Sequence, residues 1–189
     1  MTKMTGLFEQ TGFNQDISVW DVGKVSDMSD MFRDAGAFNR DLSSWTTSAV
    51  TTMARMFLSA ASFNGNISTW DVSSLLYMEG MFYNAATFNA DIGSWDVGSV
   101  VNMWRAFDRA RSFNQNITSW NVGNVLDMES MFSGAQSFDQ DLCAWGGKIA
   151  PDGSLQPKVS GMFAGSSCPQ NDDPSLIDSI VSPLCHVCL

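Results

Sequence analysis

Four cysteines lie in the last quarter of the 189-residue chain, where they could form disulfide bonds or bind a metal ion. They are Cys143, Cys168, Cys185 and Cys188. An even number of cysteines near one end favours disulfides made in an oxidising compartment, since closing a loop restricts the unfolded chain. The alternative is zinc bound by the Cys-His-Val-Cys motif that ends at Cys188. The other two cysteines do not form a second Cys-x-x-Cys pair, and this spacing disfavours zinc.

A column of acidic and amide residues recurs with a constant spacing of 25 residues. Its members are Asp16, Asp41, Asn66, Asp91, Asn116 and Asp141. Like charges that stack one strand apart repel each other, so calcium bound by the four aspartates is one hypothesis. The other is that each side chain accepts backbone N–H hydrogen bonds at a turn. The turn role is favoured, because calcium-binding repeats use denser acidic and glycine-rich motifs.

Two members of this column, Asn66 and Asn116, begin Asn-x-Ser/Thr sequons. They lie two repeat periods apart, so stacked repeats would point both side chains in the same direction. We consider them glycosylation candidates in a protein secreted by a eukaryote, provided that the amide faces solvent.

A cluster of arginine and tryptophan interrupts the regular pattern in the stretch "NMWRAFDRARSFN". Its members are Trp104, Arg105, Arg109 and Arg111. Tryptophan and arginine are typical anchors of protein interfaces, so the cluster is a candidate patch for binding a partner. The alternative, which is favoured, is that the arginines pair with neighbouring acids on a solvated face, for which Glu79 and Glu129 are candidates.

No catalytic motif accompanies these residues. The single histidine, His186, lies in the tail, which excludes a Ser-His-Asp or Cys-His site within the repeats. The sequence contains neither a glycine-rich phosphate loop nor a dinucleotide-binding fingerprint. We therefore expect a protein that is not an enzyme and needs no cofactor.

Charge and hydropathy narrow the range of partners. A net charge of −10 repels phosphate backbones, so nucleic acid is an unexpected partner. No run of eighteen apolar residues occurs, which predicts a soluble chain without direct membrane insertion. An apolar content of 44% in 189 residues is enough for a folded core.

Apart from the cysteines and His186, these candidates sit on one 25-residue repeat. Phe occupies residues 13, 38, 63, 88, 113 and 138, and Trp follows seven residues later in every unit. The second half of a unit reads Val-x-x-Met-x-x-Met-Phe, as at Val25 to Phe32. A fixed period of this size indicates units that bury their apolar faces against their neighbours, so the Met, Phe and Trp columns are predicted to form the core.

The period predicts one coil of a solenoid per unit, because propeller blades and paired-helix repeats need more residues. Apolar residues at steps of three and four from Val25 to Ala35 predict a short helix, and "DISVW" predicts a strand. The expected fold is thus an α/β repeat solenoid. It would stack about seven right-handed coils, with parallel strands on one side and helical turns on the other. We expect this solenoid to span residues 1–145, followed by a cysteine-containing cap and tail at 146–189.

Two polar columns are predicted to lie along the coils. The first is an asparagine ladder that would satisfy backbone groups at a turn: Asn14, Asn39, Asn64, Asn89 and Asn114. The second is a strip of hydroxyls: Ser18, Ser43, Ser68, Thr118, Ser44, Thr69, Ser94 and Ser119. A regular hydroxyl array could contact ice, but Gly93 and Val19 interrupt the strip, so an ordinary solvated face is favoured.

The repeat "FNQDISVWDVGKVSDMSDMFRDA" resembles that of the BspA-like leucine-rich-repeat surface proteins, which occur in mycoplasmas, other bacteria, protists and algae. The resemblance covers about Met4 to Trp145 and implies a leucine-rich-repeat-like solenoid used for adhesion or recognition, without catalytic residues. The ending also resembles the closing unit of eukaryotic members. That likeness implies a bridge between Cys143 and Cys168, which leaves Cys185 to pair with Cys188.

We therefore expect a non-enzymatic recognition or adhesion module that is secreted or displayed on a cell surface, with any signal or anchor segment outside this chain. Its partner would be a protein or glycan on a cell surface, or another copy of itself. The alternative function is a structural or ice-contacting solenoid.

Overall fold

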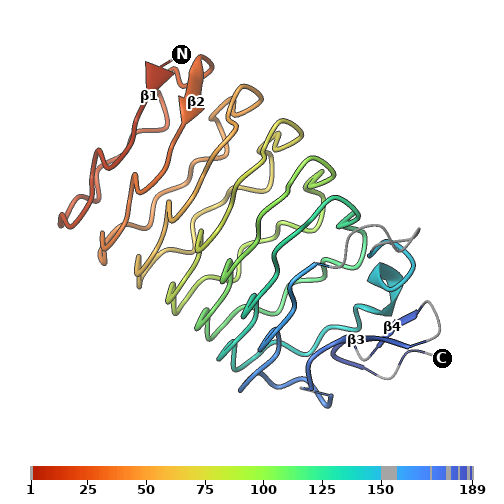
Figure 1. The fold of residues 1–189 in the computed structure, drawn as a ribbon. Helices are drawn as coiled ribbons and strands as arrows, with labels where there is room; N and C mark the ends of the chain where they lie inside the picture. The colour runs from red at the N-terminus through yellow and green to blue at the C-terminus, as the bar shows by residue number, and fades with distance from the viewer. Residues whose placement is uncertain are drawn as a thin grey trace.

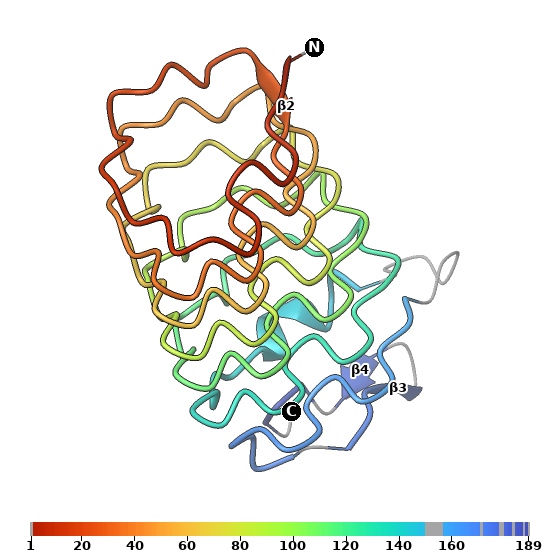
Figure 2. The same ribbon diagram turned by 90° about the vertical axis from the view of Figure 1, so that its left-hand side faces the viewer.

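Successive 25-residue units form coils that lie one on the next from the N-terminal to the C-terminal end of the molecule (Figures 1 and 2). The structure is a computed structural model. It describes residues 2–149, 157–170, 172–177, 180–182, 184–186 and 188.

Regular secondary structure is sparse and lies mainly at the two ends (Figure 1). Strands β1 (Thr2–Lys3) and β2 (Val25–Asp27) pair in parallel in the first coils. The 3-10 helix η1 (Cys143–Trp145) closes the last regular unit. Strands β3 (Ser175–Ile177) and β4 (Ile180–Ser182) form an antiparallel pair in the C-terminal segment.

The predicted α/β solenoid of parallel strands and helical turns is wrong. Over the ranges given above there is no α-helix, and the coils between β2 and η1 contain no strand. Isolated parallel bridges join neighbouring coils there, such as Thr52 with Tyr77 and Tyr77 with Asn102. The units stack with the predicted period, but they do so as chains of turns.

Tight turns replace the predicted helix because alternate N–H groups bond to different coils. The Met31 N–H donates to the Met28 carbonyl oxygen in its own coil, whereas the Met28 N–H donates to Thr52 in the next coil. Asp30 and Asp34 have φ values of 57° and 55°. A positive φ at the third residue of a turn is typical of a type II turn and ends a right-handed helix. Apolar residues at steps of three and four thus mark successive turns.

The predicted strand "DISVW" is a corner of the coil. The Ser18 N–H donates to Asp16 Oδ1 at 2.9 Å, and the Trp20 N–H donates to the Ile17 carbonyl oxygen at 3.1 Å. An aspartate that bonds the backbone two residues on makes an Asx turn, which competes with an extended strand. Val19, in this stretch, is 89% accessible.

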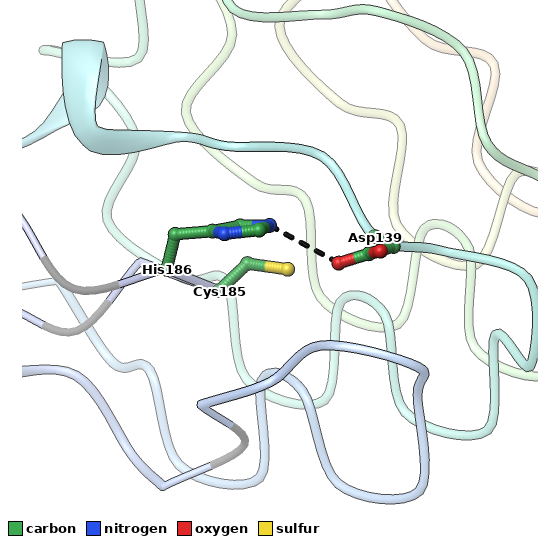
Figure 3. Close-up of side chains that lie close together, drawn as sticks. All are labelled: Asp139, Cys185 and His186. Atoms are coloured by element: carbon green, nitrogen blue, oxygen red, sulfur yellow. Dashed lines mark hydrogen bonds and ion pairs between the residues drawn. The ribbon is translucent and has the colours of Figure 1, made fainter.

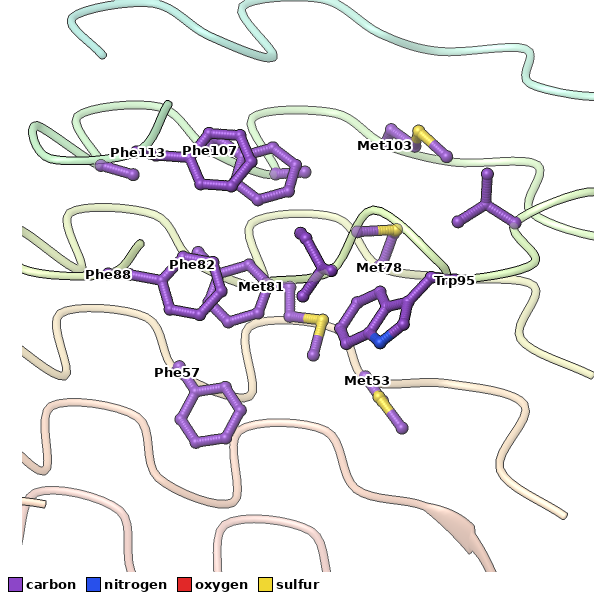
Figure 4. Packing of buried hydrophobic residues seen from close by; sticks show 14 of the residues in the cluster. Met53, Phe57, Met78, Met81, Phe82, Phe88, Trp95, Met103, Phe107 and Phe113 are labelled. Carbon is purple, nitrogen blue, oxygen red and sulfur yellow. The ribbon is translucent and has the colours of Figure 1, made fainter. Parts of the chain in front are cut away.

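The predicted packing role of the Phe, Met and Trp columns is confirmed. Phe38, Phe63 and Phe88 are fully buried, and their ring centroids are 5.9 and 6.0 Å apart along the stack. Figure 4 shows Met81 between the Phe82 ring and Trp95, and the buried Met53, Met78 and Met103 of successive coils in one column. Each coil therefore buries its apolar groups mainly against equivalent groups above and below it.

The asparagine ladder and one of the two rows of the hydroxyl strip bond to neighbouring coils, whereas Ser68 and Thr118 of the other row bond within their own coil. The Asn64 N–H donates to Asn39 Oδ1 at 2.9 Å, and the Asn89 N–H donates to Asn64 Oδ1 at 2.7 Å, as predicted for a structural ladder. The Thr69 hydroxyl donates to the Ser43 carbonyl oxygen at 2.6 Å. Because this row of hydroxyls bonds the preceding coil, its donors are not arranged to face an external surface.

The four cysteines form two disulfides, which confirms the disulfide prediction. They join Cys143 to Cys188 and Cys168 to Cys185. The zinc hypothesis is wrong, because none of the four has a free thiol. The predicted pairing of Cys143 with Cys168, and of Cys185 with Cys188, is also wrong. The tail returns to the end of the stack, where the Leu142 N–H donates to the Leu184 carbonyl oxygen, and this return brings Cys188 to Cys143.

Candidate functional site

A small notch opens on the surface of the middle coils, at the cluster of arginine and tryptophan singled out by the sequence. Its volume is about 190 Å³. The residues that line this Trp104 notch are Arg55, Leu58, Gly80, Tyr83, Trp104 and Arg105.

The notch exists because one position in a column of side chains is a glycine. Arg55, Gly80 and Arg105 are equivalent residues of three successive coils, and all three have positive φ, between 53° and 58°. A Cβ atom on Gly80 would lie 3.3 Å from Cγ of Arg55. The missing side chain leaves a gap between the two arginines, which are roughly two strand spacings, or about 10 Å, apart.

Aromatic rings and guanidinium groups form the walls. The Arg105 guanidinium lies 4.9 Å from the centre of the Trp104 ring, and the Arg109 guanidinium lies 5.9 Å from the centre of the Tyr83 ring. Both distances are within the range of cation–π attraction. Trp104 is 38% exposed, although most of the large apolar side chains in the described residues are buried. The notch thus presents an aromatic surface with cations at its edge.

The two arginines that line the notch differ in their hydrogen bonding. Arg55 Nε and Nη2 donate to the carboxylate of Asp30 at 2.9 and 2.7 Å, and this hydrogen-bonded pairing raises the pKa of Arg55. Arg105 Nε lies 3.6 Å from Asp108 Oδ2, and no described group accepts a hydrogen bond from it. Asp30 thus occupies two nitrogens of Arg55, whereas Arg105 Nε is itself buried, so only the terminal nitrogens of this 41% exposed side chain are open to another molecule.

Asp108 lies beneath this edge and is 5% exposed. Burial raises the pKa of Asp108, although the nearby cations of Arg105 and Arg109 act to lower it. The arginines therefore pair loosely with Asp108 rather than with the predicted acids. Within the described ranges neither Glu79 nor Glu129 forms an ion pair, and Glu79 Oε2 is buried without a hydrogen-bond partner.

The structure brings together only part of the predicted patch. Trp104 and Arg105 line the notch, and Arg109 reaches it through Tyr83. Arg111 does not line it, and its carbonyl oxygen accepts the Ser137 N–H. Four lining residues were missed by the sequence analysis: Arg55, Leu58, Gly80 and Tyr83. Comparing equivalent positions of successive repeats would have found the missing side chain at Gly80.

The acidic column forms turns, which is the role that the sequence favours over calcium binding. Oδ1 of Asp16 accepts the Ser18 N–H at 2.9 Å, and Asp41 accepts the Ser43 N–H in the same way. Hydrogen bonds from these serines lower the pKa of both carboxyl groups. A depression of about 330 Å³ beside them is also lined by Arg40, whose charge opposes a bound cation.

A second group of polar side chains lies at the C-terminal end. Asp139, Cys185 and His186 have potential ligand atoms within 4.8 Å of one another (Figure 3). The sulfur of Cys185 is bonded to Cys168, so it offers no thiolate to a metal ion. The remaining contact is a hydrogen bond of 3.1 Å between His186 Nε2 and Asp139 Oδ1. This contact attaches the tail to the stack.

The stacked 25-residue units define a repeat protein, and comparison with known families identifies which one. The family described as "Mycoplasma protein of unknown function, DUF285" matches residues 1–85 and 66–172. The chain therefore belongs to this family, and the two overlapping matches agree with its repeats. No curated protein and no solved structure matches the chain.

Two further observations bear on where the protein works. The two disulfides indicate an extracellular or secreted protein, because cytosolic thiols are kept reduced. A search of the described residues for a helix that could span a membrane found none of sufficient length and hydrophobicity.

Proposed function

We propose that this protein is a non-enzymatic recognition or adhesion module, secreted or displayed on a cell surface like the BspA-like proteins, and that it binds its partner at the Trp104 notch. The observation that supports this most directly is the exposed Trp104–Arg105 pair beside the gap at Gly80. Most other large side chains of the repeat belong to the core.

The composition of the notch fits an interface anchor. Tryptophan, tyrosine and arginine are enriched among the residues that dominate binding energy, in pockets that fill with a partner side chain. A volume of about 190 Å³ is below the range of roughly 300–1,000 Å³ that is usual for sites of small molecules. The notch is therefore suited to a single side chain of a larger partner.

A protein partner fits better than a glycan. Sugar hydroxyls need hydrogen-bond acceptors as well as donors, whereas the charged groups that line the notch are guanidiniums, which only donate. An apolar side chain on Tyr83, Leu58 and Trp104, next to a carboxylate that accepts from Arg105, would use both halves of the site. A cell-surface glycan and a second copy of the chain are the competing partners in the same experiment.

The test is a binding screen of the folded chain against arrays of cell-surface proteins and glycans. We expect a protein hit whose affinity falls at least tenfold in the double variant Trp104→Ala/Arg105→Ala. The matched control is Arg111→Ala, which removes a neighbouring arginine outside the notch and should bind like the wild type. A hit that the double variant binds unchanged would place the site elsewhere.

A screen without any hit, with or without calcium, would favour the alternative of a structural role. Contact with ice has less support, because hydroxyls of the Thr69 row donate to the preceding coil. A direct check is thermal hysteresis, which an ice-contacting face would produce and which Thr69→Tyr would abolish.

A further inference from the structure

We propose that Asn66 and Asn116 are acceptor sites for N-linked glycans when the chain passes through a secretory pathway that carries the transferase. The inference is independent of the Trp104 notch. It rests on the local geometry of the two sequons, on their solvent exposure and on the disulfides.

The fold directs both sequons outward. In each, the central isoleucine, Ile67 or Ile117, is fully buried in the core. Burial of the central residue fixes the two polar residues around it at the surface, and the asparagine is exposed in both coils. Asn66 and Asn116 are equivalent residues two coils apart, so they lie on the same side of the stack.

The amide of each asparagine is bonded through its oxygen only. Asn66 Oδ1 accepts the Ser68 N–H at 3.0 Å and the Ser68 hydroxyl at 2.8 Å. Asn116 Oδ1 accepts the same two groups of Thr118, at 3.1 and 2.7 Å. In the described part of the chain no hydrogen bond involves Nδ2 of either residue. A sugar on Nδ2 would therefore displace no interaction and leave the Asx turn intact.

The other four members of the column show that the turn itself does not require an amide. Asp16 and Asp41 make the same turn with a carboxylate, which accepts the hydrogen bond but has no nitrogen to modify. The turn alone thus does not explain why these two coils combine asparagine with a hydroxyl two residues later. Both sequons retain the nitrogen and the hydroxyl that glycan transfer requires.

The chemistry of the step is a transfer from a lipid-linked oligosaccharide diphosphate. A bond forms between the anomeric carbon of the first sugar and Nδ2, and the bond from that carbon to the diphosphate oxygen breaks. The lipid diphosphate leaves, and one amide proton passes to a base of the transferase. The disulfides Cys143–Cys188 and Cys168–Cys185 need the same oxidising compartment in which this transfer occurs.

The position of the glycans would leave the notch accessible. Asn116 follows Trp104 by about half of a 25-residue coil, so we expect the two to lie on different sides of the stack. Glycans on the Asn66 side would cover that side with solvated sugar. Partner binding would then be confined to the side that presents Trp104.

The experiment is secretion of the full chain from a eukaryotic cell line, with intact mass measured before and after treatment with peptide N-glycosidase. We expect two glycans on the wild type and one on Asn66→Asp or Asn116→Asp. These variants copy the aspartates of the sister coils, so they preserve the turn. Ser68→Ala and Thr118→Ala keep the asparagine but should each also remove one glycan.

Secreted protein with both disulfides formed and no glycan would overturn the proposal. So would a glycan that persists in the double variant Asn66→Asp/Asn116→Asp. A thermal melt tests whether the fold accommodates the sugars, and we expect the melting temperature to change by no more than a few degrees on deglycosylation. A much lower melting temperature of the glycosylated form would contradict the solvent-facing geometry described above.

Discussion

The regular coils and the C-terminal segment satisfy their hydrogen-bonding groups by different means. Within the coils, a residue of one unit bonds to the equivalent residue of the next, as Asn64 does with Asn39 and Asn89. At the C-terminal end the repeat stops, and the last coil still has groups that need partners. There, single contacts made by the returning tail and two disulfides replace the ladders.

At Asp139, a contact with the tail replaces a ladder hydrogen bond at a single oxygen atom. It occupies the last position of the asparagine ladder, and its N–H donates to Asn114 Oδ1 at 3.0 Å. In the earlier coils, Oδ1 at this position accepts a backbone N–H of the following coil. In Asp139 it is hydrogen-bonded to the His186 ring instead. Repetition therefore satisfies each position with one residue type, whereas an end requires a different solution for each group.

The largest expected effect comes from a charge in the shared core. Met81 is fully buried between neighbouring coils, so Met81→Asp places an unpaired carboxylate where no group can solvate it. We expect the free energy of unfolding to fall by more than about 4 kcal/mol, with cooperative loss of structure across the coils. Circular dichroism during a thermal melt measures the change.

Met81→Leu is the matched control, because it keeps the volume and polarity of the side chain. It should cost less than about 1.5 kcal/mol. If Met81→Asp melted like Met81→Leu, the position of this residue in the core would be wrong.

The second prediction concerns the difference in stability between the C-terminal segment and the coils. Replacing both members of one disulfide by serine should destabilise the C-terminal segment by about 3 kcal/mol for the pair separated by 17 residues and about 4 kcal/mol for the pair separated by 45. Amide hydrogen exchange should quicken in residues 157–188 and change little in coils such as 50–100. Equal acceleration in both regions would show that the segment is a cap on which the stack depends.

Peptide mapping without reduction checks the connectivity itself. The expected cross-linked peptides join Cys143 to Cys188 and Cys168 to Cys185. Recovery of a Cys143–Cys168 peptide would instead restore the pairing that the resemblance implies.

A smaller effect is expected from one position of the asparagine ladder. Asn64→Ala removes the acceptor of the Asn89 N–H, and we expect a loss of about 0.5–1.5 kcal/mol in urea unfolding. Asn64→Asp keeps an acceptor at this position, as Asp139 does at the end of the ladder, and should lose less. Equal losses in the two variants would indicate that the hydrogen bond is not the stabilising contact.

The smallest effect is a pH dependence at Asp108. Because burial raises the pKa of this carboxyl above its ordinary value of 3.8, its charge destabilises the fold once the pH exceeds the raised pKa. Asp108→Asn should therefore slightly increase the free energy of unfolding at neutral pH, and the gain should vanish below pH 3.8. Urea unfolding at the two pH values measures it.

Asp41 provides the comparison of opposite sign. Hydrogen bonds from Ser43 lower the pKa of Asp41, so its contribution to stability is present above pH 3.8 and is lost as the pH falls through the lowered pKa. Asp41→Asn should flatten the acid side of the stability curve, whereas Asp108→Asn should not. A gain in stability at neutral pH from both variants would contradict this assignment.

The sequence by itself determined the period, the buried columns and the polar ladders. These follow from side-chain type at fixed spacing, because a residue stacked on its own equivalent must be compatible with it. Phe63 and Asn64 illustrate this, since one is buried in the core and the other accepts a backbone N–H in the ladder, as predicted. Trp104 and Arg105 were likewise found as departures from the repeat, without knowledge of the fold.

Only the tertiary structure decided the backbone conformation, the disulfide pairing and the shape of the notch. Apolar steps of three and four fit both a helix and successive turns, and the choice depends on whether an N–H such as that of Met28 bonds within its coil or to the next. Cysteine pairing depends on the path of the tail. The notch depends on an absent side chain at Gly80, which becomes a gap only when Arg55 and Arg105 stack on either side of it.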